Sequence, residues 1–150
     1  MKLRIPPPIQ TLLACLLMYV VDYLYPLNYL QFPVNNLAIC FIIILAVFFL
    51  VPAVVGFRRS KTTVNPFQPH MASTLVVSGV YKYTRNPMYV GMAGLLLAWC
   101  LFLENPMNIV IFWSYISILT KLQIKPEELA LTKLFGKEYE SYVSSVRRWL

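Results

Sequence analysis

The sequence predicts an all-α integral membrane protein with about four transmembrane helices, of which the last two form a helical hairpin, plus a C-terminal amphipathic surface helix. Hydrophobic residues make up 59% of the 150 residues and charged residues only 13%, whereas ordinary globular chains are about 25% charged. The range 37–57 contains no charged residue. At about 1.5 Å per residue it is long enough to cross a hydrocarbon core of about 30 Å. In addition, basic residues occur on only one side of the predicted spans.

The predicted spans follow one another with short connections on one side and a long connection on the other. They cover residues 9–25, 37–57, 86–103 and 105–120. The three prolines from Pro6 to Pro8 set the start of the first span, because proline is tolerated in the first helical turn. We expect this span to be retained rather than cleaved, since no small-residue cleavage site follows it. Asn105 and Pro106 predict a sharp turn between the last two spans.

Later residues indicate how the helices pack and end. Gly91 and Gly94 lie close together on the third span, which allows another helix backbone to approach. Beyond Pro126 apolar residues recur every three or four positions, a pattern typical of an amphipathic helix. We expect this last helix to lie on the cytoplasmic membrane surface and to break at Gly136.

The distribution of basic residues predicts the orientation of the chain. If the four segments cross a membrane, the loops 26–36 and 104–108 lie on one side and contain no Lys or Arg, so all 13 basic residues lie on the other. The positive-inside rule then places both termini in the cytoplasm and makes the protein multi-pass, in the inner or plasma membrane if the source is prokaryotic. Membrane lipids near these loops account for the net charge of +7. We therefore predict no nucleic-acid partner.

Several common kinds of site are not predicted. His70 is the sole histidine and the three cysteines are far apart in the sequence, so we expect no metal site. The five glycines are scattered and form no phosphate-binding loop, and no nucleophile elbow occurs. No catalytic acid–base pair is visible either, so the catalytic residues are left unassigned.

Two polar segments interrupt the apolar sequence at the cytoplasmic ends of the hairpin. The first runs from Ser78 to Gly91 and the second begins with Glu127 and Glu128. Backbone polar groups at membrane depth need partners, so we expect the two segments to meet and bind something polar. Helix-start amides favour an anionic group, a carboxylate favours hydroxyls or a cation, and aromatic rings accept a flat base. The expected lining is therefore suited to a zwitterionic, nucleotide-like ligand; it comprises the backbone of residues 73–76, the rings of Tyr81 and Tyr89, the corner Arg85-Asn86-Pro87, and Glu127.

A purely structural interpretation of the same residues stays open. Arg85 can be a positive-inside anchor, and the two tyrosines can belong to an interfacial aromatic belt. Glu127 and Glu128 can form a charge pair at the N-terminus of the last helix. We expect Glu128 in either case to face solvent or cap the helix.

The polar motifs resemble those of the isoprenylcysteine carboxyl methyltransferases and the related phospholipid methyltransferases. The resemblance rests on residues 75–81, on Arg85-Asn86-Pro87-Met88-Tyr89-Val90-Gly91, on Asn105-Pro106, and on Glu127-Glu128 followed by Phe135-Gly136-Lys137-Glu138-Tyr139. These motifs occur in the family's order and at its spacing, over roughly residues 65–145. The family are integral membrane enzymes that transfer a methyl group from S-adenosylmethionine and release S-adenosylhomocysteine. The resemblance therefore implies one domain, 1–150, with N-terminal spans in 1–64 and a cofactor-binding core in 65–150.

The resemblance also implies roles for individual residues. Ten residues would hold S-adenosylmethionine, the first four largely through backbone atoms: Ser73, Thr74, Leu75, Val76, Tyr81, Asn86, Pro87, Met88, Tyr89 and Glu127. Three positions depart from the family pattern. Pro66 stands where glutamine is more usual and Asn86 where histidine is usual. Gln123 replaces an arginine that resembles a clamp for the substrate carboxylate, and Lys121 nearby is the alternative substrate-binding residue.

The sequence thus predicts an S-adenosylmethionine-dependent methyltransferase that acts on a lipophilic or lipidated acceptor from the bilayer, at the cytoplasmic membrane surface. Because the clamp arginine is missing, we expect the substrate to differ from a classical prenylcysteine. Two alternatives stay open. One is a non-catalytic membrane protein that binds a ligand, and the other is an NADPH oxidoreductase of the sterol-reductase kind.

Overall fold

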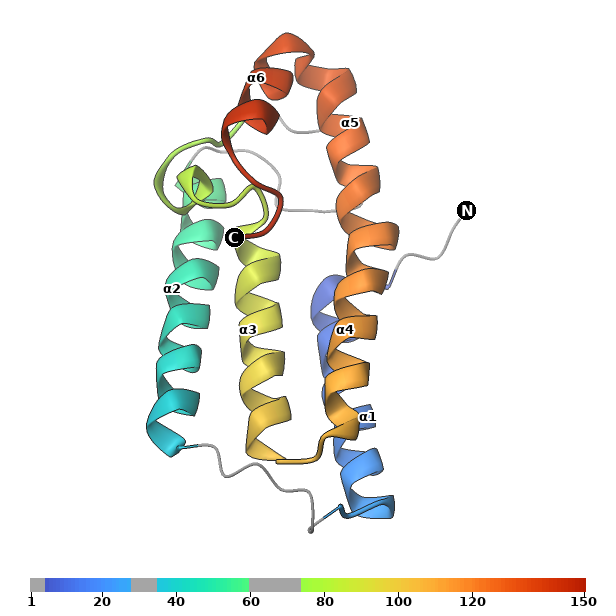
Figure 1. The fold of residues 1–150 in the computed structure, drawn as a ribbon. Helices are drawn as coiled ribbons and strands as arrows, with labels where there is room; N and C mark the ends of the chain where they lie inside the picture. The colour runs from blue at the N-terminus through green and yellow to red at the C-terminus, as the bar shows by residue number, and fades with distance from the viewer. Residues whose placement is uncertain (1–4, 28–34, 60–73) are drawn as a thin grey trace.

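The computed structural model describes residues 5–27, 35–59 and 74–150, and in these ranges the chain is helical with no strand (Figure 1). The predicted all-α class is confirmed. The elements are α1 (Pro7–Leu24), α2 (Asn36–Arg59), η3 (Gly79–Lys82), α3 (Pro87–Phe102), α4 (Met107–Leu119), η4 (Thr120–Ile124), α5 (Lys125–Phe135) and α6 (Lys137–Ser145). The first four long helices begin and end within two residues of the predicted spans, because prolines and polar turns mark most of these boundaries.

Helix α3 lies between α2 on one side and α1 with α4 on the other (Figure 1). Helices α2 and α3 approach each other closely at the two glycines of α3. A Cβ placed on Gly91 would lie 2.7 Å from the Leu50 Cβ and 2.8 Å from the Ala46 carbonyl oxygen, and one on Gly94 would lie 2.9 Å from the Ala46 Cβ. The expectation that another helix approaches at these glycines is confirmed, and the partner is α2.

Asn105 fixes the turn between α3 and α4 to the end of α1. Its side chain is buried, and Nδ2 donates to Asp22 Oδ1 at 3.2 Å and to the Tyr25 carbonyl at 2.9 Å. Its Oδ1 accepts from the Met107 amide at 3.1 Å, which starts α4. The one acidic residue of α1 therefore serves the hairpin turn at the end of the bundle opposite α6 (Figure 1).

The C-terminal half of the chain differs from the prediction at the end of the fourth span. The α-helical element α4 ends at Leu119, but the helical path does not stop there, because η4 and α5 continue it to Phe135 (Figure 1). A π-helical turn makes this possible: the Lys125 amide donates to the Thr120 carbonyl, five residues earlier, just ahead of Pro126. Since proline lacks an amide hydrogen and crowds the preceding turn, the wider turn relieves a conflict that we expected to end the helix. Gly136 then breaks the helix as predicted, with φ at +52°.

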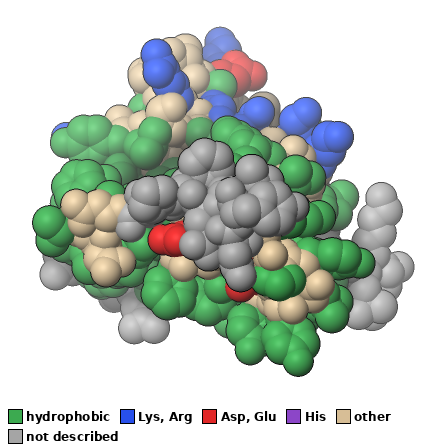
Figure 2. Space-filling view, turned by 60° about the horizontal axis from the view of Figure 1, so that its bottom comes forward, with side chains coloured by type: hydrophobic (Ala, Val, Ile, Leu, Met, Phe, Trp, Pro, Cys, Tyr) green, Lys and Arg blue, Asp and Glu red, His purple; other side chains and the backbone are tan. Residues whose placement is uncertain are grey.

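The outer surfaces of α1 and α2 are apolar. Large hydrophobic side chains are exposed along both helices, among them Leu12, Leu16, Phe41 and Phe48. Exposed apolar area on this scale is typical of a surface that faces lipid. Three stretches of the described chain are long and apolar enough to cross a membrane: Pro7–Leu24, Asn36–Gly56 and Met107–Phe135, while α3 is shorter. In Figure 2 apolar side chains cover most of the visible face, and Lys and Arg side chains gather toward one edge.

Candidate functional site

The polar centre of the structure is a hydrogen-bonded group of three side chains: Tyr89, Gln123 and Glu127. The Tyr89 hydroxyl donates to Glu127 Oε1 at 2.6 Å, and Gln123 Nε2 donates to the same oxygen at 2.8 Å. Tyr89 and Gln123 are buried, with Gln123 only 1% exposed. A carboxylate that accepts two such bonds inside an apolar bundle is held in one position.

Local sequence explains why these three side chains converge. Tyr89 lies in the first turn of α3, where Pro87 occupies the start of the helix. Gln123 belongs to the π-helical turn, and Glu127 lies in the first turn of α5, four residues later. In a helix, side chains four residues apart lie on one face, so the Gln123 amide reaches the Glu127 carboxylate. Two predicted segments, far apart in the sequence, thus meet as expected.

Glu128 does not face solvent, and that expectation is wrong. Its side chain is 14% exposed and lies between two arginines: Arg85 Nη2 is 3.0 Å from its Oε1, and Arg148 Nη2 is 2.6 Å from its Oε2. The Arg148 Nε also donates to both carboxylate oxygens at 3.0 Å. These hydrogen bonds to Glu128 raise the pKa of the Arg148 guanidinium. Glu128 turns inward because Arg85, whose side chain is only 8% exposed, needs an anion within the protein.

The C-terminal segment covers the corner between η3 and α3. The Arg148 carbonyl accepts from Thr84 Oγ1 and from Asn86 Nδ2, both at 3.0 Å. The Arg85 amide donates to the Arg147 carbonyl at 2.9 Å. Asn86, which we predicted to contact a cofactor, therefore uses a side-chain donor to bind the Arg148 carbonyl. Sequence reasoning missed the part played by Arg147 and Arg148, because contacts across more than sixty residues leave no local spacing signal.

A second cluster of buried residues flanks the polar centre. Val76, Val80 and Tyr81 pack there with Tyr139 and Tyr142. The Tyr142 hydroxyl donates to the Tyr81 carbonyl at 2.6 Å. Burial raises the pKa of the Tyr81 phenol, with further contributions from Tyr142 and from Glu127. Burial, together with the charge of Glu128, likewise raises the pKa of Tyr139 to about 12. These phenols stay neutral at physiological pH and can act as hydrogen-bond donors.

The remaining predicted residues fall into three groups. Leu75 and Met88 pack against the cluster around Tyr81. Pro87 is buried at the start of α3, whereas Thr74 is exposed. Ser73 and Pro66 lie outside the described residues. The structure thus brings Val76, Tyr81 and the corner 86–89 to the same end of the bundle as Glu127 (Figure 1).

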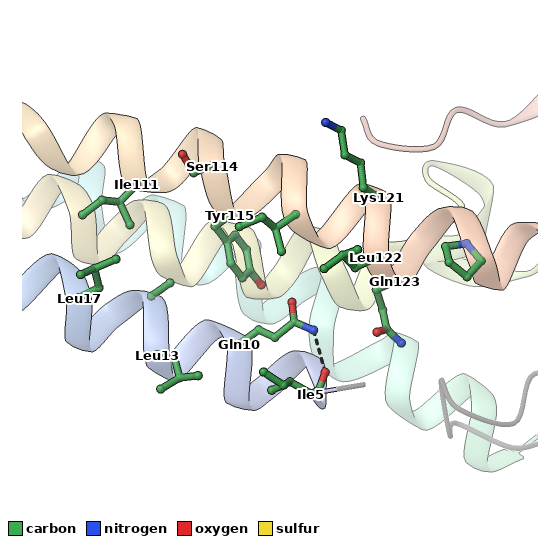
Figure 3. Close-up of a pocket in the computed structure, with 13 residues that line it drawn as sticks. Ile5, Gln10, Leu13, Leu17, Ile111, Ser114, Tyr115, Lys121, Leu122 and Gln123 are labelled. Carbon is green, nitrogen blue, oxygen red and sulfur yellow. Dashed lines mark hydrogen bonds between the residues drawn. The ribbon is translucent and has the colours of Figure 1, made fainter. Parts of the chain in front are cut away.

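A cavity of about 500 Å³ runs between α1 and α4 and reaches Gln123 (Figure 3). Apolar side chains of both helices line most of its length, and Gln10 and Gln123 lie at one end. Lys121 borders the cavity, but in Figure 3 its amine extends away from α1. Of the two predicted substrate-binding residues, Gln123 lines the cavity and also donates a hydrogen bond to Glu127.

Comparison with known proteins gives several matches. A family model described as phospholipid methyltransferase matches residues 34–138. A probable protein-S-isoprenylcysteine O-methyltransferase of Oryza sativa subsp. indica is 33% identical over 65% of this chain and 51% of its own length. The protein-S-isoprenylcysteine O-methyltransferase of Dictyostelium discoideum is 37% identical over 48% of this chain and 30% of its own.

A Haemophilus influenzae protein described as uncharacterized is 40% identical over 42% of this chain, a stretch that is 100% of that protein. No solved structure matches the chain significantly. The chain covers about a third to half of the length of the two methyltransferases above. The matched region 34–138 contains α2, α3, α4 and α5, together with Tyr89, Gln123 and Glu127. The predicted resemblance is therefore confirmed, and this chain belongs to the phospholipid methyltransferase family, alongside the isoprenylcysteine methyltransferases.

Proposed function

We propose that this protein transfers a methyl group from S-adenosylmethionine to a lipophilic acceptor at the cytoplasmic surface of a membrane. The observation that carries the proposal is the Glu127 carboxylate, which Tyr89 and Gln123 hold in place at the junction of α3 and α5. Family membership supports the reaction class.

The donor set at this end of the bundle fits S-adenosylmethionine. The ligand carries an ammonium and ribose hydroxyls, for which Glu127 is an acceptor, and a flat adenine, for which a tyrosine ring is a suitable surface. Among the described residues, Arg85 Nε and Nη1 have no hydrogen-bond partner although both are buried. Guanidinium donors of this kind suit a carboxylate such as that of the ligand.

When bound, S-adenosylmethionine supplies a methyl group on a positively charged sulfur, which is electrophilic without acid catalysis. The protein's task is then to hold the acceptor atom in line with that methyl group. Proximity and orientation supply about 7–11 kcal/mol in favourable cases. Glu127, fixed by two hydrogen bonds, orients the ligand, and the buried phenols of Tyr81 and Tyr89 exclude water from it. Because the ligand supplies the electrophile and the protein supplies orientation, the reaction needs no catalytic acid–base pair among the described residues.

The acceptor enters from the bilayer and lacks a free carboxylate where it meets Gln123. Gln123 presents a neutral amide and already donates to Glu127, so it cannot neutralise a carboxylate as an arginine would. Both termini face the cytoplasm in this proposal, because the Lys and Arg residues of the described ranges belong to the end of α2, to η3 and the residues just before α3, and to η4, α5, α6 and the C-terminal segment, toward one end of the bundle.

Transfer of labelled methyl groups tests the proposal. Purified protein in detergent is incubated with methyl-labelled S-adenosylmethionine and a lipid extract of its host membranes. We expect label in the organic phase with the wild-type protein and much less with Glu127→Gln. Glu138→Gln, an exposed carboxylate on α6, is the matched control. Equal labelling with Glu127→Gln would exclude Glu127 from the reaction, and no labelling by any variant with any lipid fraction would contradict the proposal.

A further inference from the structure

The side chains that line the cavity between α1 and α4 are mostly apolar along its length and polar at one end, an arrangement that suits a lipid. Along α1 and α4 its lining includes Leu13, Leu17, Ile111 and Ile118, together with Ser114 and with Tyr115, whose hydroxyl is hydrogen-bonded to Thr11. The end near Gln123 also holds Gln10 (Figure 3). The polar end is the one nearer α5, hence the cytoplasmic end in the proposed topology. A lipid in the inner leaflet has the same arrangement, with its head at the surface and its chain directed into the bilayer.

The polar end calls for a hydrogen-bond donor. Gln10 Nε2 donates to the Ile5 carbonyl at 2.7 Å, but Gln10 Oε1 is buried and has no partner among the described residues. An unsatisfied buried acceptor is costly, so a donor from a ligand would be favoured there. Gln123 donates to Glu127, and the Glu127 carboxylate adds negative charge near this end of the cavity. Lys121, the nearest cation on this wall, extends its amine away from α1 (Figure 3).

We propose that this cavity holds the hydrocarbon chain of a single-chain methyl acceptor, whose amine or hydroxyl head meets Gln10 and Gln123. The inference rests on the proposed function and names its substrate class. The volume of about 500 Å³ falls in the range of about 300–1,000 Å³ that holds one small ligand, which favours one chain over two. One wall belongs to α1, which lies outside the matched family region 34–138. Acceptor choice therefore depends on a helix that the family model does not cover.

Photolabelling in detergent tests this proposal with three probes that carry the same diazirine in the chain. The first is a long-chain alkylamine, the second the corresponding fatty acid, and the third a diacyl phosphatidylcholine. We expect the amine to label peptides of α1 and α4, and the other two to label them weakly. Equal labelling by the phosphatidylcholine would mean that ordinary bilayer lipid fills the cavity, and stronger labelling by the fatty acid would overturn the assignment of the head.

Matched variants of α1 test whether the alkylamine binds in this cavity. Leu13→Trp fills the cavity, and we expect labelling by the amine to fall about tenfold, since loss of about two buried methylenes has that effect on affinity. Leu12→Trp is the control, because Leu12, like Leu13, is exposed on α1 but does not line the cavity. Equal effects of the two changes would overturn the proposal. Gln10→Leu should weaken labelling by the amine while leaving labelling by a chain without a head group unchanged.

Binding of S-adenosylhomocysteine to the same samples separates the two proposals. We expect Leu13→Trp to bind it as the wild type does, which also shows that the variant is folded. If the wild type labels as expected but does not bind S-adenosylhomocysteine, the proposed methyl transfer fails and the lipid site stands. If it binds S-adenosylhomocysteine but the amine labels other segments, the lipid site is overturned and methyl transfer stands.

Discussion

The Tyr89 hydroxyl donates to Glu127 Oε1 across 2.6 Å and so joins the first turn of α3 to the first turn of α5. Thirty-eight residues separate the two in the sequence. Both side chains are held by the helices that carry them, so the carboxylate is in place before any ligand binds. Such a preorganised acceptor is what charge-assisted binding of an ammonium or hydroxyl group requires.

Glu127→Gln keeps the shape of the side chain but removes its charge. We expect it to weaken binding of S-adenosylhomocysteine by about 1.5–3 kcal/mol, the value of a hydrogen bond to a charged group. Tyr89→Phe removes one neutral donor and should weaken the same binding by about 0.5–1.5 kcal/mol. Titration calorimetry measures both, with Glu138→Gln as the exposed control. Equal, small effects of Glu127→Gln and Glu138→Gln would favour a purely structural role for Glu127.

We expect Glu128 to contribute to the free energy of unfolding through its ion pairs with the two arginines. Glu128→Gln leaves Arg85, whose side chain is 8% exposed, without its anion. Removal of one partner of a buried ion pair costs about 3–5 kcal/mol, and we expect the lower end because Glu128 is itself 14% exposed. Thermal unfolding in detergent checks this, with Glu140→Gln on α6 as the exposed control. An unchanged melting temperature for Glu128→Gln would show that the two arginines do not depend on it.

The contact between α2 and α3 predicts opposite effects of two glycine substitutions. Gly91→Ala places a methyl group 2.7 Å from Leu50 Cβ and 2.8 Å from the Ala46 carbonyl oxygen, so the helices must separate. Overpacking of this kind costs about 1–3 kcal/mol. In Gly56→Ala the nearest atoms are 4.0 Å away, and helix propensity should stabilise the protein by up to about 1 kcal/mol. Unfolding by denaturant in detergent measures both, and destabilisation by Gly56→Ala alone would contradict this packing.

The orientation can be tested with single cysteines in a background that lacks Cys15, Cys40 and Cys100. Cysteine at Asn35, which is exposed at the start of α2, should react with a membrane-impermeant maleimide in intact cells. Cysteine at Ser141, exposed on α6, should react only after permeabilisation. Reaction of both positions in intact cells would contradict the topology that we propose.

The sequence predicted those features that depend on short-range signals. Prolines and polar turns located most helix ends, and the glycine pair indicated a close helix contact without naming its partner. The two polar segments were expected to meet, and Tyr89 and Glu127 do. It did not predict that the helix continues past Pro126, because the π-helical turn ahead of it depends on how η4 packs in the bundle. Nor did it predict the inward position of Glu128, which depends on Arg148 at the far end of the chain.

The sequence likewise did not predict the cavity next to α1. Leu13 and Ile118 belong to ordinary apolar spans, and only the packing of α1 against α4 brings them to the same cavity. Hydrophobic periodicity says which residues are apolar, but in a membrane span it does not separate those that face lipid from those that line a cavity.

Titration calorimetry of S-adenosylhomocysteine into the detergent-solubilised wild-type protein, with NADPH in a parallel titration, tests the central claim most directly. We expect saturable binding of S-adenosylhomocysteine that Glu127→Gln weakens, and no binding of NADPH. Binding of NADPH without S-adenosylhomocysteine would indicate an oxidoreductase. Binding of neither ligand by folded protein would contradict the assignment of the Tyr89–Glu127 end of the bundle as a cofactor site.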